Sequence, residues 1–430
     1  MKKKAKKITQ TTILQSLYLT SAFCFTNDIY SYAASSAFSF LFSFVPVVLL
    51  IVAILIRIMH ASPDTILSIL SSTGVFSETF DLEHAVNQVL SVKTITVFEI
   101  VLVFSIIWMG RRFFASIMQN MYVIFKQHRK PRPVLTQLFI FLCEFIIIIF
   151  TATLIFAIIS FKALRNSGAL EKMFPHFPER LTTYLANFLP MILLFISLLC
   201  CYRFESGTKP KWIKCAMSAF ACTLTFFIFQ RLMGLFINVS KYNLVYGILS
   251  NVIVLLMEAY IFFQLFFFFA QYLYVSQFFD ELLLAELYLL PGESENGFFS
   301  KLKRKLFIRP DYIIYNKKNI LKFAQGETIY KKDDLGSDAY YIVKGSVEIK
   351  HSSKTQYLKT GAFFGEEACM IEEGRNESAI ACEDTTLITI PKETFQSLLD
   401  RNPKVTKAAL SHISSYFAKV YNGRREDFGL

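Results

Sequence analysis

The sequence predicts an α-helical polytopic membrane domain of about six transmembrane helices, followed by a soluble α+β domain folded as a β-roll, or jelly roll. Up to about Phe279 the chain consists largely of apolar segments of about twenty residues or more, the length that crosses a bilayer. After Leu306 it changes to short alternating strands, Gly turns and polar helices, which are typical of a soluble domain. A hydrophobic content of 54%, with 46 Phe, agrees with a membrane body.

Apolar segments in the first part of the chain fit membrane spans, because each is long enough to cross the hydrocarbon core as a helix. Arg111 and Arg112 interrupt the second segment, which is either one span that continues into the cytoplasm or a kinked pair of helices. Before the spans, Ile13–Cys24 is diluted by polar residues, which favours an interfacial helix over a signal peptide. The expected spans are Ala33–Ile58, Thr94–Phe125, Val134–Phe161, Leu181–Tyr202, Cys215–Asn238 and Gly247–Val275.

The placement of basic residues predicts the orientation of these spans. The net charge of +12 does not indicate nucleic-acid binding, because the basic residues gather at the chain start and in alternate loops beside the spans. Cytoplasmic loops carry such an excess of Lys and Arg, so we expect a multi-pass protein with both termini in the cytoplasm. The basic clusters are Lys2, Lys3, Lys4, Lys6 and Lys7, then Lys126, Arg129, Lys130 and Arg132, then Arg203, Lys209, Lys211 and Lys214.

The sequence divides into a membrane domain over 1–280, a linker over 281–319 and a soluble domain over 320–430. The linker contains a basic patch at Lys301–Lys305, which either contacts anionic lipid headgroups or forms a solvated helix face. In the soluble domain, an apolar stripe predicts one closing helix over Lys392–Tyr421. The expected strands are Ile320–Phe323, Thr328–Tyr330, Tyr340–Val343, Val347–Lys350, Tyr357–Leu358, Ser378–Cys382 and Thr386–Ile390.

The soluble domain contains a series of short motifs in a fixed order. They are Gly326-Glu327 after Phe323, Gly345 after Tyr340–Val343, Gly361 before Phe363-Phe364-Gly365-Glu366, then Ser378-Ala379, and Asn402-Pro403 after Leu398-Leu399. In order and spacing these motifs resemble the cyclic nucleotide-binding domain family. The resemblance implies the β-roll fold of that family and cAMP or cGMP as a regulatory ligand, with no other cofactor.

The same resemblance implies roles for particular residues. In that family a Gly-Glu pair opens the phosphate-binding cassette and its carboxylate holds the ribose 2′-hydroxyl, so Gly365 and Glu366 carry over directly. An Arg shortly before a Ser/Ala pair neutralises the cyclic phosphate, since Arg–phosphate contacts are strong. The ligand-binding residues expected from the resemblance are Gly365, Glu366, Glu367, Arg375, Ser378 and Ala379.

The position of the phosphate-binding Arg leaves two alternatives open. Counted forward from Glu366 the residue is Arg375, but counted back from Ser378-Ala379 the position belongs to Glu377. If a two-residue bulge lets Arg375 reach the phosphate, the domain binds a nucleotide. If Glu377 faces the phosphate instead, it repels the anion, and the domain is a ligand-free module for protein interaction or dimerisation. Asp333, where many family members have Gly, is a second departure.

The membrane part resembles the YihY/BrkB family of bacterial inner-membrane proteins over most of Asp28–Gln277. The resemblance rests on Ala33-Ala34, Ala37-Phe38, Leu41, Ser43 and Pro46 after Asp28, on Asn120 and Tyr122, on Tyr202-Arg203, and on Tyr242 with Tyr246-Gly247. It implies a location in the bacterial inner membrane. The family once carried a ribonuclease BN label, but the six His of this chain are scattered and form no cluster with metal-ligand spacing. We therefore expect no enzyme activity, no catalytic residue and no metal.

Charged residues within the predicted spans are the candidates for a function inside the membrane, because a charge at that depth is costly and requires a partner or a watery cavity. They either line a polar path for a substrate or form structural salt bridges between helices. The candidates are Glu144, Glu258, Arg111, Arg112 and Arg231.

Together these patterns predict a bacterial inner-membrane protein that transports or handles a lipid-like or small polar substrate and is regulated by its cytoplasmic domain. The alternative is an envelope scaffold without transport, whose soluble domain has lost its ligand and recruits a partner. The expected partners are the lipid bilayer, a cyclic nucleotide and a second copy of the chain in a homo-oligomer.

Overall fold

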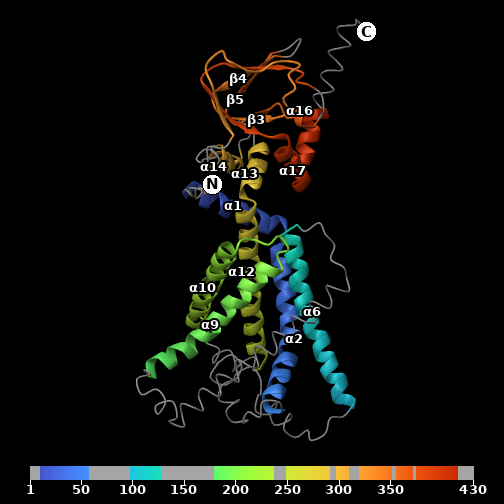
Figure 1. Ribbon diagram of the computed structural model, residues 1–430. Coiled ribbons are helices and arrows are strands. Elements are labelled where there is room, and N and C mark those ends of the chain that lie inside the picture. Colours follow the sequence, from blue (N-terminus) through green and yellow to red (C-terminus); the bar gives the residue numbers. More distant parts are fainter. Residues whose placement is uncertain are drawn as a thin grey trace. The chain divides into compact units, whose positions relative to one another are not determined.

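The computed structural model of the chain describes residues 10–57, 97–126, 179–236, 248–290, 297–308, 319–350, 355–370 and 374–414. The chain forms two compact units. One consists of Met1–Leu19 with Val275–Leu430, and the other of Thr20–Tyr274. Figure 1 shows a β-roll in the first unit and long helices in the second.

Long helices make up the described part of Thr20–Tyr274. Each of them overlaps a predicted span, and the third predicted span, Val134–Phe161, lies outside the described residues. Two helical stretches among the residues searched, Trp212–Leu235 and Val252–Gln277, are long and apolar enough to cross a membrane. The predicted fold class is confirmed, whereas the number of six spans stays a prediction. The helices are α2 (Ile29–Arg57), α6 (Val97–Ile124), α9 (Glu179–Phe204), α10 (Trp212–Phe236) and α12 (Ile248–Gln277).

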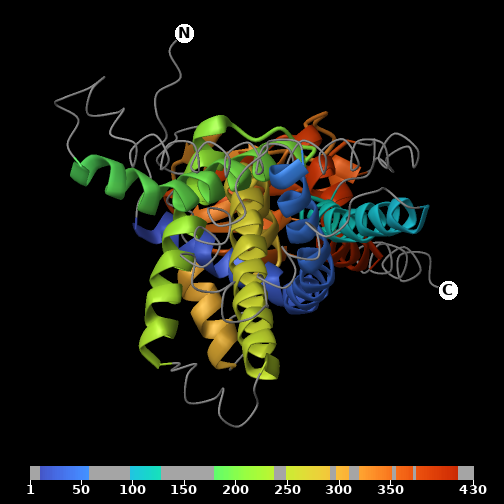
Figure 2. The ribbon, with the colours of Figure 1, turned by 90° about the horizontal axis from the view of Figure 1, so that it is seen from below.

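Polar side chains are buried between these helices. α2 and α6 run side by side (Figures 1 and 2), and Asn120 Nδ2 on α6 donates to Ser36 Oγ on α2 at 3.0 Å. Similarly, the buried Tyr202 hydroxyl on α9 donates to the Phe266 carbonyl on α12 at 2.9 Å. Such bonds between helices are the polar contacts that hold membrane helices together, where burial of apolar surface cannot.

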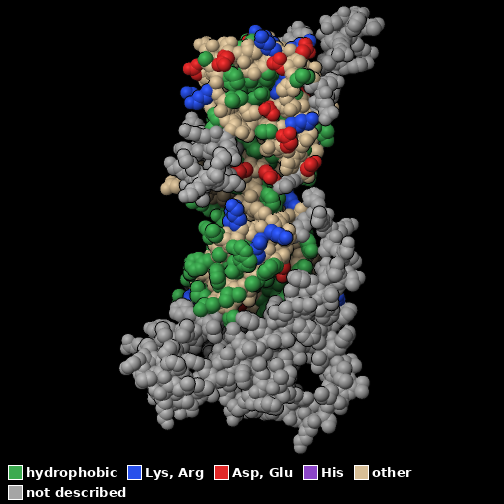
Figure 3. Space-filling view, viewed as in Figure 1, with side chains coloured by type: hydrophobic (Ala, Val, Ile, Leu, Met, Phe, Trp, Pro, Cys, Tyr) green, Lys and Arg blue, Asp and Glu red, His purple; other side chains and the backbone are tan. Residues whose placement is uncertain are grey.

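Apolar side chains lie on the outside of the same helices. On α10 they recur every three or four residues, so they form one continuous face of the helix. Figure 3 shows hydrophobic side chains covering the described surface around this helix. A face of this composition is expected to contact lipid rather than water. Its exposed members are Ile213, Met217, Phe220, Leu224, Ile228, Leu232 and Leu235.

Two four-stranded antiparallel sheets form the roll of the C-terminal domain. Their strand orders are β1-β8-β3-β6 and β2-β7-β4-β5. Alternate residues point inward, as in β4, where Val347 and Ile349 are buried. The strands are β1 (Ile320–Phe323), β2 (Thr328–Tyr330), β3 (Ala339–Lys344), β4 (Ser346–Lys350), β5 (Thr355–Lys359), β6 (Phe363–Phe364), β7 (Ser378–Ala381) and β8 (Thr385–Ile390).

The closing helix is interrupted, which corrects the prediction of one helix over Lys392–Tyr421. α17 (Lys392–Arg401) ends at Asn402, whose backbone is extended with φ −130° and ψ 96°, and helix resumes over 403–414. The cause is Pro403, because a proline disfavours helical backbone at the residue before it and has no N–H to donate. Residues 415–421 lie outside the described part of the chain.

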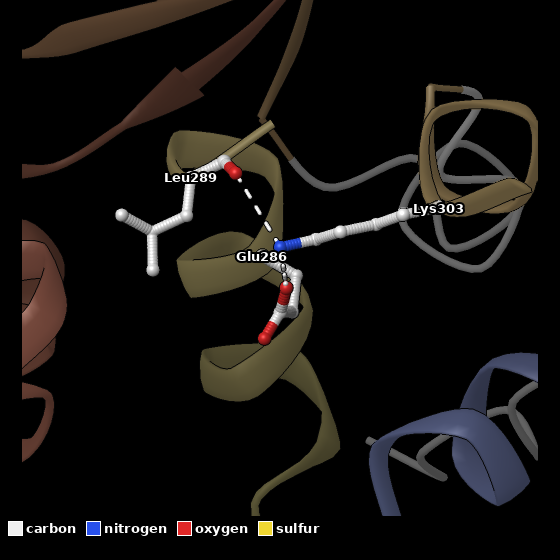
Figure 4. A network of polar contacts seen from close by, with 3 residues as sticks. All are labelled: Glu286, Leu289 and Lys303. Atoms are coloured by element: carbon white, nitrogen blue, oxygen red, sulfur yellow. Dashed lines mark hydrogen bonds and ion pairs between the residues drawn. The ribbon is translucent and has the colours of Figure 1, made fainter. Parts of the chain in front are cut away.

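The segment expected as a linker contains two helices, α13 (Phe279–Tyr288) and α14 (Phe298–Phe307). Leu284, Leu287 and Tyr288 of α13 belong to the same hydrophobic core as β3, β8 and α17. Lys303 of α14 turns toward α13, where its Nζ lies 2.6 Å from Glu286 Oε2 and donates to the Leu289 carbonyl at 3.4 Å (Figure 4). The basic patch is therefore divided, because Lys303 faces the protein while Lys301 and Lys305 are exposed.

Candidate functional site

A tight turn after β6 opens the candidate site in the C-terminal domain. β6 ends at Phe364 and is followed by Gly365, whose φ of +73° lies in the left-handed region that favours glycine, and then by the short helix α16 (Glu367–Met370). A Cβ at position 365 would lie 2.6 Å from Arg375 Nη1, so this glycine also leaves room for the guanidinium. Glu366, which lies between Gly365 and α16, is buried, with 6% of its surface exposed. We call residues 363–370 the cassette.

The Arg375 side chain reaches the cassette and is buried there, with 3% of its surface exposed. Its Nη1 donates to the Gly365 carbonyl at 2.8 Å, and its Nη2 donates to the Asp338 carbonyl. The guanidinium also lies over the ring of Tyr330, with Cζ 4.3 Å from the ring centroid, which is a cation–π contact. Its Nε has no hydrogen-bond partner among the described residues. The cassette therefore contains a buried cation with one donor still unpaired.

The backbone around Arg375 is fixed by the loop that follows β2. The Arg375 N–H donates to the Asp334 carbonyl at 2.9 Å, and the Asp333 N–H donates to the Arg375 carbonyl at 2.7 Å. Asp333 itself has φ +70°, a conformation that Asp tolerates better than most residues. The departure at Asp333 noted in the sequence is thus part of the turn that holds Arg375.

Glu377 has a different position from Arg375. Its Oε1 accepts a hydrogen bond from the Tyr330 hydroxyl at 3.1 Å, and its side chain is buried. Tyr330 therefore contacts both residues, Arg375 over the face of its ring and Glu377 at its hydroxyl. Of the two counts made on the sequence, the one that starts at Glu366 leads to the side chain that is bonded to the cassette.

The other predicted ligand-binding residues fall into two groups. Glu367 lies in the cassette beside Glu366, whereas Ser378 and Ala379 lie on β7. The Ser378 hydroxyl accepts a hydrogen bond from the Lys332 N–H at 2.9 Å, and Ala379 is buried in the core of the roll. The structure therefore brings Glu367 to the cassette and gives Ser378 a backbone partner on the loop after β2.

The acids of the site influence one another. Burial, together with the neighbouring charges of Glu366 and Glu377, raises the pKa of Glu367 to about 8, while Arg375 opposes the shift. At neutral pH the Glu367 carboxyl is consequently protonated and uncharged. The charge next to Arg375 is thus less negative than the three acids in the sequence suggest.

Sequence reasoning missed two residues at the site, His412 and Tyr288. The His412 Nδ1 lies 3.6 Å from Glu366 Oε1 and 3.3 Å from the Tyr288 hydroxyl oxygen. The neighbouring Glu366 carboxylate is the main cause that raises the pKa of His412. No local motif marks either residue, because they meet the cassette only through the packing of α13 and of the helical stretch 403–414.

In the helical unit, two of the candidate residues line one cavity. Arg231 on α10 and Glu258 on α12 lie at a cavity of about 280 Å³, together with Gln230 and the apolar residues Phe227, Met233 and Val254. Arg111 and Arg112 lie on α6, where Arg112 is exposed and Arg111 is half-buried. Glu144 lies outside the described residues.

The two parts define a class of protein: a helical membrane body joined to a soluble roll with a cassette of the cyclic-nucleotide-binding type. The profile of the virulence factor BrkB family matches residues 25–277, and that of the cyclic nucleotide-binding domain matches residues 320–402. The chain belongs to the virulence factor BrkB family. It is a membrane protein of that family fused to a cyclic nucleotide-binding domain. Neither of these families is a family of enzymes, and the absence of enzyme activity stays a prediction.

Known relatives match the soluble domain. The cyclic AMP receptor protein of Thermus thermophilus is 32% identical over 89 residues, which are 19% of this chain and 41% of that protein. The cAMP-dependent protein kinase regulatory subunit of Hypocrea atroviridis is 35% identical over 79 residues, 18% of this chain and 17% of that protein. The chain thus covers less than half of these curated relatives. The crystal structure of the Thermus thermophilus catabolite activator protein is 27% identical, covering 24% of this chain and 50% of that chain, with a TM-score of 0.22.

Proposed function

We propose that the chain is an inner-membrane protein whose helical body transports or handles a polar or lipid-like substrate under the control of a cyclic nucleotide bound by its C-terminal domain. In this proposal the body is multi-pass and both termini lie in the cytoplasm, as the distribution of basic residues favours. The domain would then sample the cytoplasmic nucleotide pool. A homo-oligomer stays a prediction.

The observation that carries the nucleotide half of the proposal is the buried guanidinium of Arg375 in the cassette. Its hydrogen bonds go to the carbonyl oxygens of Gly365 and Asp338, which phosphate oxygens can replace with stronger, charge-assisted bonds. Its unpaired Nε offers one further donor. Glu366 beside it is a carboxylate that can accept a hydrogen bond from a ribose hydroxyl. The relatives that match this domain are named for cyclic AMP, which further supports this ligand class.

The three acids near Arg375 are compatible with an anionic ligand. Glu377 is bonded to the Tyr330 hydroxyl, and Glu367, with its pKa raised to about 8, is neutral at pH 7. Glu366 provides the carboxylate that a ribose hydroxyl would use. The Glu377 carboxylate is bound at the hydroxyl of Tyr330, whereas Arg375 lies over the face of the same ring.

A titration of the full chain in detergent micelles with fluorescent cAMP and cGMP analogues tests this half. Arg375→Lys keeps the charge but removes the planar pair of donors, and we expect roughly 10-fold to 100-fold weaker binding, the loss of one or two charge-assisted hydrogen bonds. Lys322→Ala, an exposed change on β1, is the matched control and should leave binding unchanged. A folded wild-type chain that binds neither nucleotide would identify the domain as a ligand-free interaction module.

The membrane half rests on the cavity lined by Arg231 and Glu258. A cavity with a cation, an acid and an amide between otherwise apolar helices offers partners to a polar or zwitterionic group, which lipid cannot provide. Lipid headgroups and small polar solutes share this chemistry. The cavity is therefore a place where such a substrate could be held during transfer.

Transfer by the full chain in reconstituted vesicles tests this half, with headgroup-labelled phospholipid in one arm and a radiolabelled zwitterionic amino acid in the other. Glu258→Gln should lower the transfer of the true substrate at least about tenfold, because it removes the charge that pairs with the cationic group. Gln264→Asn, also on α12 but outside the cavity lining, should leave transfer unchanged. If the wild type transfers nothing in either arm while folded, the envelope-scaffold alternative is favoured.

A further inference from the structure

Three elements of the C-terminal unit meet at the ring of His412. His412 lies on the helical stretch 403–414, Glu366 belongs to the cassette, and Tyr288 is the last residue of α13. One ring nitrogen, Nδ1, lies 3.3 Å from the Tyr288 hydroxyl oxygen and 3.6 Å from Glu366 Oε1. The residue expected to bind the ribose is therefore already in contact with a side chain from a distant part of the chain.

Packing fixes the partners of this junction. Tyr288 is 8% exposed, and its ring stands edge-on to Phe363 and Phe395, with centroid distances of 5.1 and 5.7 Å. Val405 and Ala409 on the helical stretch are fully buried in the same core. Ala409 lies three residues before His412, almost one helical turn, so the anchored turn presents the imidazole to both oxygens.

The interactions of His412 Nδ1 with the Tyr288 hydroxyl and the Glu366 carboxylate depend on whether the imidazole is protonated. When His412 is charged, its Nδ1–H is drawn toward the Glu366 carboxylate, and the interaction is an ion pair. The other carboxylate oxygen, Oε2, has no hydrogen-bond partner among the described residues. A ribose hydroxyl that donates to Glu366 competes with the imidazole for the same carboxylate.

We propose that His412 is a latch, which in the absence of nucleotide ties α13 to the cassette and which the ribose of a bound nucleotide releases from Glu366. This inference rests on the proposed nucleotide function and adds its route. α13 begins at Phe279, two residues after α12 ends at Gln277, so loss of the tie at the Tyr288 hydroxyl acts on the segment that follows the last long helix of the membrane body in the chain. The nucleotide thereby favours one of two states, as any ligand with a differential affinity must.

Thermodynamic linkage predicts how removal of the His412 contact changes the affinity for cAMP. A contact that is broken on binding opposes binding, so its removal must tighten the affinity. We expect His412→Ala to bind cAMP about twofold to fivefold more tightly than the wild type, the range for an ion pair with one exposed partner. Tyr288→Phe keeps the ring packing and removes only the hydroxyl, so it separates α13 from His412 while the His412–Glu366 pair stays. It should leave the affinity unchanged and remove the effect of cAMP on α13 exchange. Lys407→Ala, an exposed change on the same stretch, should have no effect.

Hydrogen exchange of the full chain in detergent micelles provides the second readout. In the wild type, saturating cAMP should speed exchange of the α13 amides. In His412→Ala those amides should exchange at the faster rate without nucleotide, and cAMP should change them no further.

The outcomes separate the latch from the function on which it rests. If the wild type, folded, binds no cyclic nucleotide, the proposed function fails and the latch fails with it. If cAMP binds through Glu366, so that Glu366→Gln weakens it, but His412→Ala leaves the affinity, and His412→Ala and Tyr288→Phe leave the α13 exchange, as in the wild type, the latch alone is wrong. Tyr288→Phe, which preserves the core contacts, keeps the test decisive should His412→Ala fail to fold.

Discussion

The helical unit and the β-roll distribute their side chains in opposite ways. α10 exposes Met217, Phe220 and Leu224 and buries Ser218 and Thr223, whereas the roll buries its apolar strand residues and exposes Lys and Asp side chains. Figure 3 shows the contrast, with charged side chains spread over the described surface of the roll and hydrophobic ones over that of the helices. One rule explains both, because each unit turns toward its solvent the groups that this solvent accepts. The comparison teaches that burial has to be judged against the solvent of each region.

The largest effect should come from placing the same charge on the exposed surface of each region. Leu224 is 42% exposed near the middle of α10, and Leu335 is 94% exposed on the loop after β2. Leu224→Asp should cost about 2.5–3.5 kcal/mol if this face meets lipid, while Leu335→Asp should stay within about 0.5 kcal/mol. The yield of monodisperse chain from the membrane fraction measures the first, and thermal unfolding measures the second. Equal tolerance of both changes would mean that α10 faces water.

Within the roll, two glycines with similar backbone conformations allow a loss of stability to be distinguished from a loss of nucleotide affinity. Gly365 and Gly326 have φ of +73° and +81°, but a Cβ would meet Arg375 Nη1 at 2.6 Å at position 365 and open space at position 326. Each change to Ala should cost about 1–2 kcal/mol for the left-handed backbone. Gly365→Ala alone should also displace the guanidinium and weaken nucleotide binding roughly tenfold or more. Equal affinities of the two variants in the same titration would contradict the assignment of Arg375.

Part of the fold could be predicted from local sequence patterns, and part of the site could not. The strands and long helices could be predicted because periods of two and of about 3.6 residues are written locally into the chain. The break at Asn402 was missed, although Pro403 marks it in the sequence. The apolar stripe continues through the break and so predicted one uninterrupted helix. The choice between Arg375 and Glu377 could not be predicted, because it depends on the hydrogen bonds between Arg375 and the loop at Asp333 and Asp334.

His412 and Tyr288 could not have been found from the sequence at all. They are 124 residues apart and meet only because α13 and the helical stretch 403–414 bury their apolar sides in one core. Arg231 and Glu258 were expected among the charges that line a polar path or pair between helices, but not at one cavity, since the pairing of α10 with α12 around it is a tertiary feature. Residues that act through contacts between distant elements have no local signature.

A smaller effect is expected from a buried amide in the helical unit. Asn120 Nδ2 donates to Ser36 Oγ, whereas Gln119, the preceding residue, is exposed on the same helix. Asn120→Ala should destabilise the contact between α2 and α6 by about 0.6–2 kcal/mol, the range for hydrogen bonds between membrane helices. Gln119→Ala should change little. Thermal unfolding of the two variants in the same detergent measures the difference, and a larger loss for Gln119 would contradict the buried polar interior.

The smallest effect is the pH dependence of cAMP binding. It belongs to the roll, because the buried acids of the roll can exchange protons with the buffer. Glu367, with a pKa of about 8 in the folded chain, faces Glu366, Glu377 and Arg375, and His412 lies against Glu366. Below pH 8 the Glu367 carboxyl is neutral, and above it the carboxylate repels a bound cyclic phosphate. Affinity for cAMP should therefore fall severalfold between pH 7 and 9.

Glu367→Gln is the control for this pH dependence, because it stays neutral throughout the range and should bind with nearly constant affinity from pH 7.5 to 9. The pKa of His412 is also raised, and loss of its proton as the pH rises ends the ion pair with Glu366 and so weakens the latch. The slope that Glu367→Gln removes belongs to Glu367 alone, and the slope that His412→Ala removes belongs to the latch. If both variants keep the wild-type slope, a different group governs binding, and the protonated Glu367 no longer explains how a site with three acids accepts an anion.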